Sequence, residues 1–493
     1  MSIDAQVARA RAAQPSWAAT SVRARATIIE HFRALVFDER EAIARTVTAE
    51  TGKPLAESLV ADISMALDGA RFLCRVAERT LAPERKRSRT MAAWRKSIAI
   101  HHDPFGVVGI VSPWNYPFFF PAMHSLTALI AGNAVLLKPS EHTPLCAEHI
   151  GRLLAQAGLP TNVFTLVQGD GRVGAELVNA NVDKIFFTGS ERTGRTIAVA
   201  CAPRFVPVSL ELGGSDAAIV LEDANFEIAA SGIVWGRFTN AGQTCVAVKR
   251  VIAVGAAHDA LVARIAATVS RLTVGTSDDA NTDIGPLVTA DQAMTMAAQL
   301  EDAIALGATV AARVDGTNSG GAWSPVVVLT NVTKAMRVWH EETFGPVLAV
   351  MRASSEADAV ALANDSHYGL SASVWSHNRH RARRVAAQLQ VGAVAINDSV
   401  INAGLPEVAH GGVKASGMGR IHGTQGLLEC VRTRTVIDDF LPNVRQPWWF
   451  GYDATTTSNL DSYLRLAHGR TIVERLSGIP GAMRMLLRRR SAL

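Results

Sequence analysis

Residues 238–245 read FTNAGQTC, and they place Cys245 directly after a small, flexible Gly-Gln-Thr turn. Residues 211–214 read ELGG and put Glu211 34 residues upstream of that cysteine. A thiol and a carboxylate of this kind can serve as the nucleophile and the base of a covalent thioester mechanism. A lone cysteine is more often a small, buried apolar side chain, so this interpretation depends on whether other stretches agree with it.

Length and composition indicate an ordinary globular protein with room for more than one domain. The chain has 493 residues, of which 48% are hydrophobic and 19% charged. We expect no secretory signal in residues 1–16 and no membrane span, because no apolar run reaches the necessary length. The cysteines are scattered without CxxC spacing, which argues against disulfides or a metal site and favours a reducing cytoplasm. They are Cys74, Cys146, Cys201, Cys245 and Cys430.

The net charge of +5 belongs to the end of the chain. Residues 455–493 contain seven arginines against Asp461 and Glu474, which gives 7 − 2 = +5. The rest of the chain is balanced, with 49 − 7 = 42 basic and 44 − 2 = 42 acidic residues. The basic character therefore gives no reason to expect nucleic-acid binding by the body of the protein.

Strand-like and helix-like stretches alternate between residues 106 and 212, after a largely helical segment at 17–80. We expect strands at 107–111, 134–138, 162–167, 184–188 and 207–212. Helices are expected from residue 119, at 143–157, at 173–179 and from residue 192. This alternation predicts a parallel sheet with helices on both faces, which binds ligands beyond the carboxyl ends of its strands.

A second α/β unit is expected between residues 215 and 425. Its predicted strands lie at 251–254, 326–329, 347–350 and 394–397, with a glycine-rich loop at 316–321. Outside the two units, strands are expected at 96–102, before a turn at Asp103-Pro104, and at 426–439.

Seven short motifs follow one another along the chain. They read PWNYP at 113–117, KPSE at 138–141, FTGS at 187–190 with Gly194, ELGG at 211–214, NAGQTC at 240–245, EETFGP at 341–346, and GGVK at 411–414 with SGMGR at 416–420. In order and spacing they resemble the aldehyde dehydrogenase superfamily, over roughly residues 20–440. The resemblance implies an aldehyde dehydrogenase-like α/β fold with a parallel-sheet dinucleotide-binding domain, an α/β catalytic domain and a β oligomerisation ribbon.

The resemblance also implies a role for each motif. Cys245 would attack the aldehyde, the Asn115 amide and the Cys245 N–H would hold the oxyanion, and Glu211 would activate water. The residues implied for cofactor binding are Pro113, Trp114, Lys138, Ser140, Glu141, Gly189, Ser190, Leu212, Glu342 and Phe344. Considered alone, Asn115 would be interpreted as a turn residue and Glu342 as a surface acid. Only the whole set of motifs favours the catalytic interpretation.

Two stretches bear on the cofactor. Gly189 and Ser190 come after a strand, where a glycine lets backbone N–H groups approach a pyrophosphate, although a plain strand-to-helix turn reads the same way. Glu141 can accept hydrogen bonds from the adenosine ribose and would repel a 2′-phosphate. We therefore expect NAD, with NADP less favoured. Glu141 also fits a simple helix N-terminus.

The expected reaction is oxidation of an aldehyde to the free acid, because members that acylate coenzyme A commonly lack the base at Glu211. Succinate-semialdehyde members place arginines at positions that correspond to Met123 and Thr239, so an apolar aliphatic or aromatic aldehyde is favoured here. The alternatives are a succinate-semialdehyde dehydrogenase and a cofactor-independent thiol esterase. Two departures from the superfamily, Ser215-Asp216 after ELGG and His410 before the late Gly-Gly, leave the catalytic groups in place.

The resemblance implies a homodimer or homotetramer and a domain plan. The plan assigns 1–87 and 105–213 to NAD binding, 88–104 and 426–440 to the ribbon, 214–425 to catalysis and 441–493 to a basic, aromatic tail. In that tail Ile479, Met483 and Leu487 are spaced for one helix face, with Pro480 expected in the helix's first turn. The tail is interpreted either as packing on the body or a partner subunit, or as contact with a membrane surface.

Overall fold

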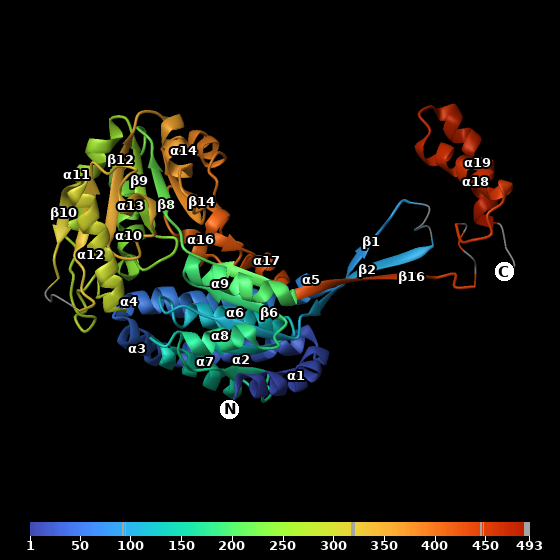
Figure 1. The fold of residues 1–493 in the computed structure, drawn as a ribbon, viewed down its shortest axis with the longest axis horizontal. Coiled ribbons are helices and arrows are strands. Elements are labelled where there is room, and N and C mark those ends of the chain that lie inside the picture. Colours follow the sequence, from blue (N-terminus) through green and yellow to red (C-terminus); the bar gives the residue numbers. More distant parts are fainter. Residues whose placement is uncertain (91–92, 94, 317–320, 444–445, 447, 488–493) are drawn as a thin grey trace. The chain divides into compact units, whose positions relative to one another are not determined.

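The structure is a computed structural model, and it describes residues 1–90, 93, 95–316, 321–443, 446 and 448–487. The chain divides into two units, one of Met1–Ala82 with His102–Arg432 and one of Pro83–His101 with Thr433–Leu493. Figure 1 labels the elements of both. The expected boundary between two lobes within the first unit stays a prediction.

The first sheet of the larger unit has the order β15-β7-β6-β3-β4-β5. Its strands are β3 (Val107–Val111), β4 (Ala134–Lys138), β5 (Phe164–Leu166), β6 (Lys184–Thr188), β7 (Val208–Glu211) and β15 (Gly417–Met418). The pairs are parallel except at β15, which runs antiparallel to β7. The expected parallel sheet is therefore confirmed, with a short antiparallel edge added from far along the chain.

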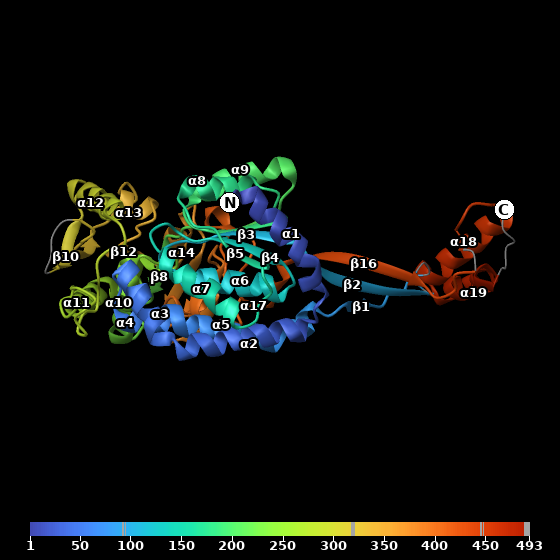
Figure 2. The ribbon, with the colours of Figure 1, turned by 90° about the horizontal axis from the view of Figure 1, so that it is seen from below.

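Helices cover both faces of this sheet because its strands are apolar on both sides (Figure 2). One face packs against α1 (Ile3–Ala19), α8 (Gly171–Asn179) and α9 (Glu191–Cys201). The other packs against α2 (Val22–Asp38), α5 (Met65–Leu81), α6 (Phe119–Ile130) and α7 (Pro144–Gln156). The short elements α3 (Arg40–Thr51), α4 (Leu55–Glu57) and the π-helical η1 (Ser58–Ser64) join α2 to α5.

The second sheet of the larger unit has the order β10-β11-β12-β9-β8-β13-β14. Its strands are β8 (Asp216–Val220), β9 (Val248–Val254), β10 (Thr309–Val314), β11 (Val326–Thr330), β12 (Val347–Ala353), β13 (Ser371–Trp375) and β14 (Ala393–Ile396). All pairs are parallel except β10 with β11. Around this sheet lie α10 (Phe226–Phe238), α11 (Ala257–Val269), α12 (Ala290–Ala305), α13 (Arg337–His340), α14 (Glu356–Asn364), α15 (Arg379–Ala386) and α16 (Ile401–Gly404). The second α/β unit is thus present, whereas residues 317–320 of the expected glycine-rich loop lie outside the described residues.

A third sheet has the order β1-β2-β16, with β1 (Glu84–Lys86), β2 (Lys96–Pro104) and β16 (Val431–Asp439). Two expectations need correction here. Residues 426–428 are not strand but the end of α17 (Gly423–Leu428), whose buried residues Gly423, Gly426 and Leu427 follow the three- and four-residue spacing of one helix face. The strand expected to end before Asp103 continues through it to Pro104.

The smaller unit ends in two helices that pack on each other, α18 (Ala454–His468) and α19 (Ile472–Leu487). Pro480 lies inside α19 rather than in its first turn, because the helix already begins at Ile472. Pro447 and Arg488–Arg490, part of the expected tail, lie outside the described residues. Among the described helices, none has both the length and the apolar composition needed to cross a bilayer.

Candidate active site

One cavity of about 300 Å³ in the larger unit collects most of the site residues expected from the sequence. The expected residues that line it are Pro113, Trp114, Asn115, Gly189, Ser190, Glu211, Leu212, Cys245, Glu342 and Phe344. They come from the ends of β3, β6 and β7 and from loops of the second sheet, where open α/β sheets bind their ligands. Phe120, Thr188, Gly213, Gln292 and Thr295 complete the wall.

The loop that carries Cys245 has an unusual backbone. Asn240, Ala241 and Gly242 all have positive φ, at 53°, 52° and 76°. This conformation costs energy for residues other than glycine, and such strain persists only where neighbouring groups hold it. A Cβ on Gly242 would lie 2.5 Å from the Gly345 carbonyl oxygen, so glycine is needed for space as well. The loop is therefore held in one shape against the 341–346 stretch.

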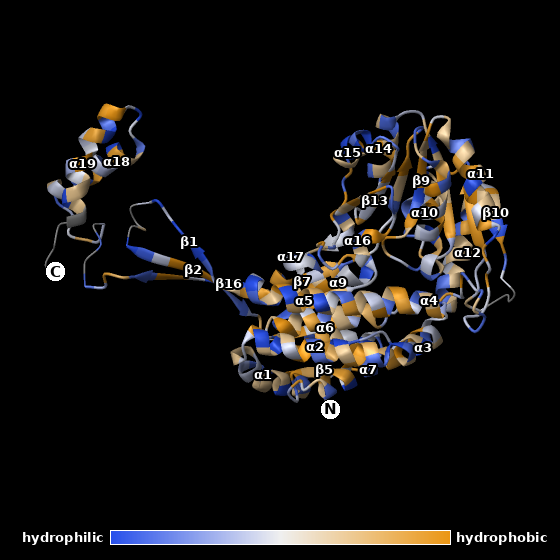
Figure 3. Ribbon diagram, turned by 180° about the vertical axis from the view of Figure 1, so that it is seen from behind, coloured by the Kyte–Doolittle hydropathy of each residue, from blue (hydrophilic) through white to orange (hydrophobic). Residues whose placement is uncertain are grey.

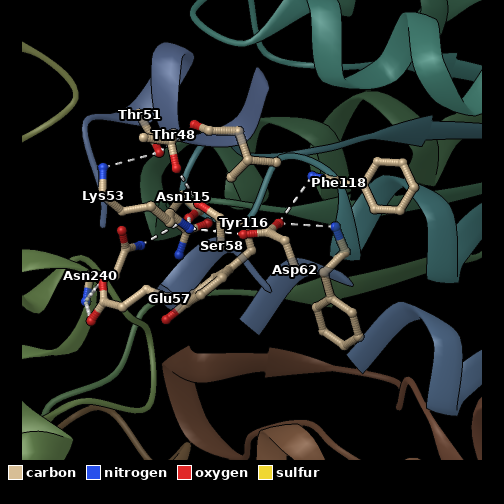
Figure 4. Close-up of polar contacts among 12 residues, drawn as sticks. Thr48, Thr51, Lys53, Glu57, Ser58, Asp62, Asn115, Tyr116, Phe118 and Asn240 are labelled. Atoms are coloured by element: carbon tan, nitrogen blue, oxygen red, sulfur yellow. Dashed lines mark hydrogen bonds and ion pairs between the residues drawn. The ribbon is translucent and has the colours of Figure 1, made fainter. Parts of the chain in front are cut away.

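A buried polar network fixes that loop to Asn115, the residue expected to hold the oxyanion (Figure 4). Asn240 Nδ2 donates to the Asn115 carbonyl at 2.9 Å, and Asn115 Nδ2 donates to the Gln243 carbonyl at 2.9 Å. The Glu57 carboxylate accepts from the Asn240 N–H at 2.9 Å and from the Thr239 hydroxyl at 2.9 Å. The Asn115 amide and the Cys245 loop therefore share one rigid frame.

Below this frame lies a buried ion pair that the sequence did not indicate. Lys53 Nζ lies 2.9 Å from Asp62 Oδ2 and donates to the Asn115 carbonyl at 2.8 Å, and both side chains are almost fully buried. Asp62 Oδ1 accepts from the N–H groups of Phe118 and Phe119, both at 3.1 Å, at the start of α6. A buried pair of charges is tolerated only when hydrogen bonds satisfy it, and here those bonds hold the Asn115 backbone.

Charge around the thiol is set by a second lysine that the sequence did not single out. Lys249 Nζ donates to the Thr244 carbonyl at 2.8 Å and to the Cys245 carbonyl, and lies 3.9 Å from Glu342 Oε1. Burial raises the pKa of the Cys245 thiol to about 12, although the Lys249 cation lowers it. A thiol with a raised pKa is protonated at neutral pH, so a base must take its proton before it attacks.

Glu342 is held beside the ELGG turn. Its Oε1 accepts from the Gly214 N–H at 3.1 Å, and a Cβ on Gly213 would lie 2.3 Å from its Oε2. Glycine at 213 is therefore required for this carboxylate to come close. Phe344 and Trp114 meet edge to face with their ring centroids 5.5 Å apart, which gives the cavity an aromatic wall.

Glu211 lines the same cavity, and its carboxyl group lies near the His410 ring. Glu211 Oε2 lies 3.9 Å from His410 Nε2, and both side chains are nearly fully buried. Neither carboxylate oxygen has a hydrogen-bond partner among the described residues. Burial raises the pKa of Glu211 well above its usual value, and the Arg420 cation opposes that rise. Burial and Arg420 both lower the pKa of His410, to about 4, so this ring is neutral at pH 7.

The remaining expected residues lie outside this cavity. Lys138 lines a second cavity, of about 350 Å³, between α8 and α9, together with Arg192 and Thr193. Glu141 Oε2 pairs with Lys138 Nζ at 2.9 Å, which places its carboxylate beside that lysine. Ser140 is buried and accepts from the His142 N–H at 3.2 Å, and it lines neither cavity.

The two cavities fit a nicotinamide dinucleotide. Ser190 is the N-cap of α9, where the helix's free N–H groups favour a phosphate. A Cβ on Gly194 would lie 2.5 Å from Leu212 Cδ2, so glycine lets α9 approach the sheet edge there. Lys138 and Arg192 supply positive charge to the second cavity, and Phe344 belongs to the aromatic wall of the first. Within the described ranges, no three His, Cys, Asp or Glu side chains are grouped so that they could hold a metal ion.

Comparison with known proteins agrees with this geometry. The model of the aldehyde dehydrogenase family matches residues 1–436. The chain is 38% identical over 447 residues to a Mycolicibacterium smegmatis protein whose provisional name is succinate-semialdehyde dehydrogenase [NADP(+)], covering 90% of this chain and 86% of that protein. It is also 38% identical over 467 residues to the 4,4'-diapolycopene aldehyde oxidase of a Methylomonas species, covering 95% and 87%.

Solved structures give the same result. An NADP-dependent enzyme of E. coli is 32% identical, with a TM-score of 0.85 over 89% of this chain and 90% of that one. The NAD+ complex of an aldehyde dehydrogenase from Bacillus cereus is 33% identical, with a TM-score of 0.85 over 89% of each chain. The chain belongs to the aldehyde dehydrogenase family, and it is an NAD(P)-dependent oxidoreductase with that family's α/β fold. Because relatives carry names for NADP as well as NAD, they do not support the expected disadvantage of NADP.

Proposed function

We propose that this enzyme oxidises apolar aldehydes to free carboxylic acids, with Cys245 as nucleophile and Glu211 as base. The observation that carries the proposal is the single cavity that Cys245, Glu211 and Asn115 share with Glu342 and Phe344. The chemistry needs a nucleophile, a base and an oxyanion donor around one reacting carbon, with a cofactor pocket beside them.

In the proposed mechanism Glu211 takes the thiol proton and Cys245 Sγ attacks the aldehyde carbon. The negative charge that forms on the aldehyde oxygen is held by the Asn115 amide, which the Lys53, Glu57 and Asn240 contacts keep in place. Glu342, Ser190 and Lys138 would hold the dinucleotide, which would supply the acceptor for the hydride that leaves the former aldehyde carbon. Glu211 releases the thiol proton to solvent and then takes a proton from water, and the hydroxide adds to the thioester carbon. The C–S bond breaks to release the acid, and the Cys245 thiolate takes the proton back from Glu211.

The proposal for apolar substrates rests on the wall of the cavity. Its side chains include Trp114, Phe120 and Phe344, and no lysine or arginine is among the described residues that line it. Met123 is packed in the core, and Thr239 donates to Glu57, so neither position supplies a cation to the cavity. A buried substrate carboxylate without a partner would be costly.

Succinate semialdehyde is the second candidate, because several relatives are named for it. The diapolycopene aldehyde oxidase name of another favours a long apolar aldehyde instead. The test is to measure kcat/KM for hexanal, benzaldehyde and succinate semialdehyde, each with NAD and with NADP. The absorbance of the reduced cofactor reports the rate. A higher kcat/KM for succinate semialdehyde than for both apolar aldehydes would overturn the substrate proposal. Ester hydrolysis without cofactor tests the thiol esterase alternative.

We also propose that Glu141 and its partner Lys138 set cofactor choice. Glu141 is not among the residues that line the second cavity, but its carboxylate pairs with Lys138, which lines that cavity with Arg192. The carboxylate offsets the charge of Lys138 and would repel a 2′-phosphate brought beside it. NAD is therefore the proposed preferred cofactor, with NADP used less well. The assays above measure the ratio of kcat/KM with NAD to kcat/KM with NADP, and equal values for the two cofactors would contradict the preference.

The free cysteines support a cytoplasmic setting.

A further inference from the structure

Helix α19 exposes a stripe of large apolar side chains. Ile472, Leu476, Ile479 and Met483 have exposed fractions of 76%, 58%, 40% and 50%. Their spacings of four, three and four residues put them on one side of the helix. Exposing an apolar stripe of this length to water is unfavourable in free energy, and such a stripe is characteristic of a surface that binds a partner.

The stripe is not the face that joins the two helices of the hairpin. The face of α19 toward α18 is built of small or buried residues, with Ala482 at 3% and Met485 at 5% exposed. A Cβ on Gly478 would lie 2.2 Å from the Ser462 carbonyl oxygen, so the two backbones approach closely there. The hairpin therefore packs through one face of α19 and leaves the stripe residues of another face exposed. Figure 3 shows apolar and polar residues alternating along both helices of the hairpin.

Arginines flank the stripe. At 100° per residue, Arg475 lies on one side of the Ile472–Leu476–Met483 line and Arg484 on the other. Arg475 Nε donates to the Gly469 carbonyl and Arg484 Nε to the Pro480 carbonyl, so among the described residues neither charge is cancelled by an ion pair. Residues 455–493 carry the whole net charge of +5.

We propose that the α19 stripe docks on an anionic lipid surface, with Ile472, Leu476, Ile479 and Met483 among the acyl chains and the arginines at the phosphates. Cations that flank an apolar helix face are the pattern of interfacial helices. Trp449 and Tyr452, 51% and 62% exposed near the start of the hairpin, are residue types that favour the headgroup level. A second copy of the same stripe is the less suitable occupant, because it would bring two charges of +5 together.

This inference goes beyond the proposed reaction and does not depend on it. If the substrates are apolar, an enzyme docked on the membrane would take them from the lipid, where apolar molecules concentrate. If they are not, the docking surface and its test are unchanged.

The test is co-sedimentation of the full-length enzyme with vesicles of neutral phosphatidylcholine, alone or mixed with anionic phosphatidylglycerol. The wild type is expected to pellet with the anionic vesicles only, and less so as salt rises. Leu476→Glu with Met483→Glu is expected to lower binding at least tenfold. Arg475→Gln with Arg484→Gln is expected to lower it by roughly thirtyfold.

The matched control is Ile228→Glu with Ile304→Glu, two exposed apolar residues of the larger unit, at 57% and 46%. This variant is expected to bind vesicles as the wild type does, and all variants should keep their activity on a water-soluble aldehyde. A wild type that stays in the supernatant with anionic vesicles at low salt would overturn the proposal. So would a Leu476→Glu/Met483→Glu variant that binds normally, or one that only lowers the oligomer mass, which would assign the stripe to a contact between copies.

Discussion

At the scale of single residues, the proposed mechanism gives Cys245 the role of nucleophile and Glu211 the role of base. Replacing Cys245 by Ala should abolish reduced-cofactor formation while cofactor binding is kept, because Lys138, Ser190 and Glu342 remain. Replacing Glu211 by Gln should leave at most a burst of reduced cofactor and lower steady turnover by roughly 100-fold or more, since deacylation loses its base. Stopped-flow absorbance separates the two phases. Steady turnover of Glu211→Gln at the wild-type rate would show that Glu211 is not the base.

His410 gives a prediction about pH. Glu211 must be ionised to accept a proton, so activity appears as pH rises through its raised pKa. The Nε2 of neutral His410 lies 3.9 Å from Glu211 Oε2, which is beyond hydrogen-bond distance, but a small movement of either side chain would let it donate to the carboxylate and favour that ionised form. His410→Phe should therefore raise the pKa of Glu211 further, move the ascending limb of kcat to higher pH, and lower kcat at pH 7 roughly tenfold.

His410→Gln, which can still donate, is the control and should recover part of the loss. Arg420, Glu429, His422 and His124 also act on this group of side chains and stay in place in both variants. A fall in kcat that is equal at every pH, or a pH profile identical to the wild type, would contradict a role for His410 in setting the base.

The sequence indicated the reacting residues better than their support. Cys245, Glu211, Asn115 and Glu342 stand in motifs, so they could be named, and the structure brings all four to one cavity. Lys53, Glu57, Asp62 and Lys249 stand alone in the sequence as ordinary charged residues. Their importance comes from burial and from partners that lie between 4 and 183 residues away along the chain, and no sequence motif marks either property.

At the scale of elements, the Gly242 turn can be tested for the two reasons it needs glycine. Gly242→Ala adds positive-φ strain and a Cβ 2.5 Å from the Gly345 oxygen. We expect it to lower the free energy of unfolding by about 2–4 kcal/mol and to displace the Cys245 loop, with a large loss of kcat. Gly307→Ala, at φ +96° with no atom within 4 Å of its Cβ, isolates the strain and should cost about 1 kcal/mol without loss of activity. If Gly242→Ala and Gly307→Ala lowered the free energy of unfolding by the same amount, the close contact with the Gly345 oxygen would add nothing to the backbone strain.

Elements with strong local signals were predicted well, and those that depend on distant packing were not. The apolar strands Val107–Val111, Ala134–Lys138 and Lys184–Thr188 were expected at those positions and are confirmed. The strand expected at 426–439 begins only at Val431, because core contacts of Leu427 keep the preceding turn helical. Strand β1 carries the exposed sequence Glu-Arg-Lys, and its pairing with β2 has no sequence signature.

At the scale of the whole molecule, the third sheet offers an edge for assembly. In the order β1-β2-β16, strand β16 is at the edge, and most of its nine residues are exposed, with Ile437 at 62%. A long exposed edge strand is a template for pairing with another chain. This edge supports the expectation that the enzyme is a dimer or tetramer of the 52.5 kDa chain.

Ile437→Pro removes an N–H from β16 and should prevent pairing along that edge. We expect light scattering to show a fall from a multiple of 52.5 kDa toward a single chain, with dissociation strongest at low protein concentration. Ile437→Val keeps the N–H and the β-branched shape, so it should leave the mass unchanged. Because the catalytic cavity is lined by residues of the larger unit alone, the dissociated chain should keep its cofactor affinity even where it loses stability. A monomeric wild type would contradict the role of β16 in assembly, and an Ile437→Pro variant of unchanged mass would move the interface elsewhere.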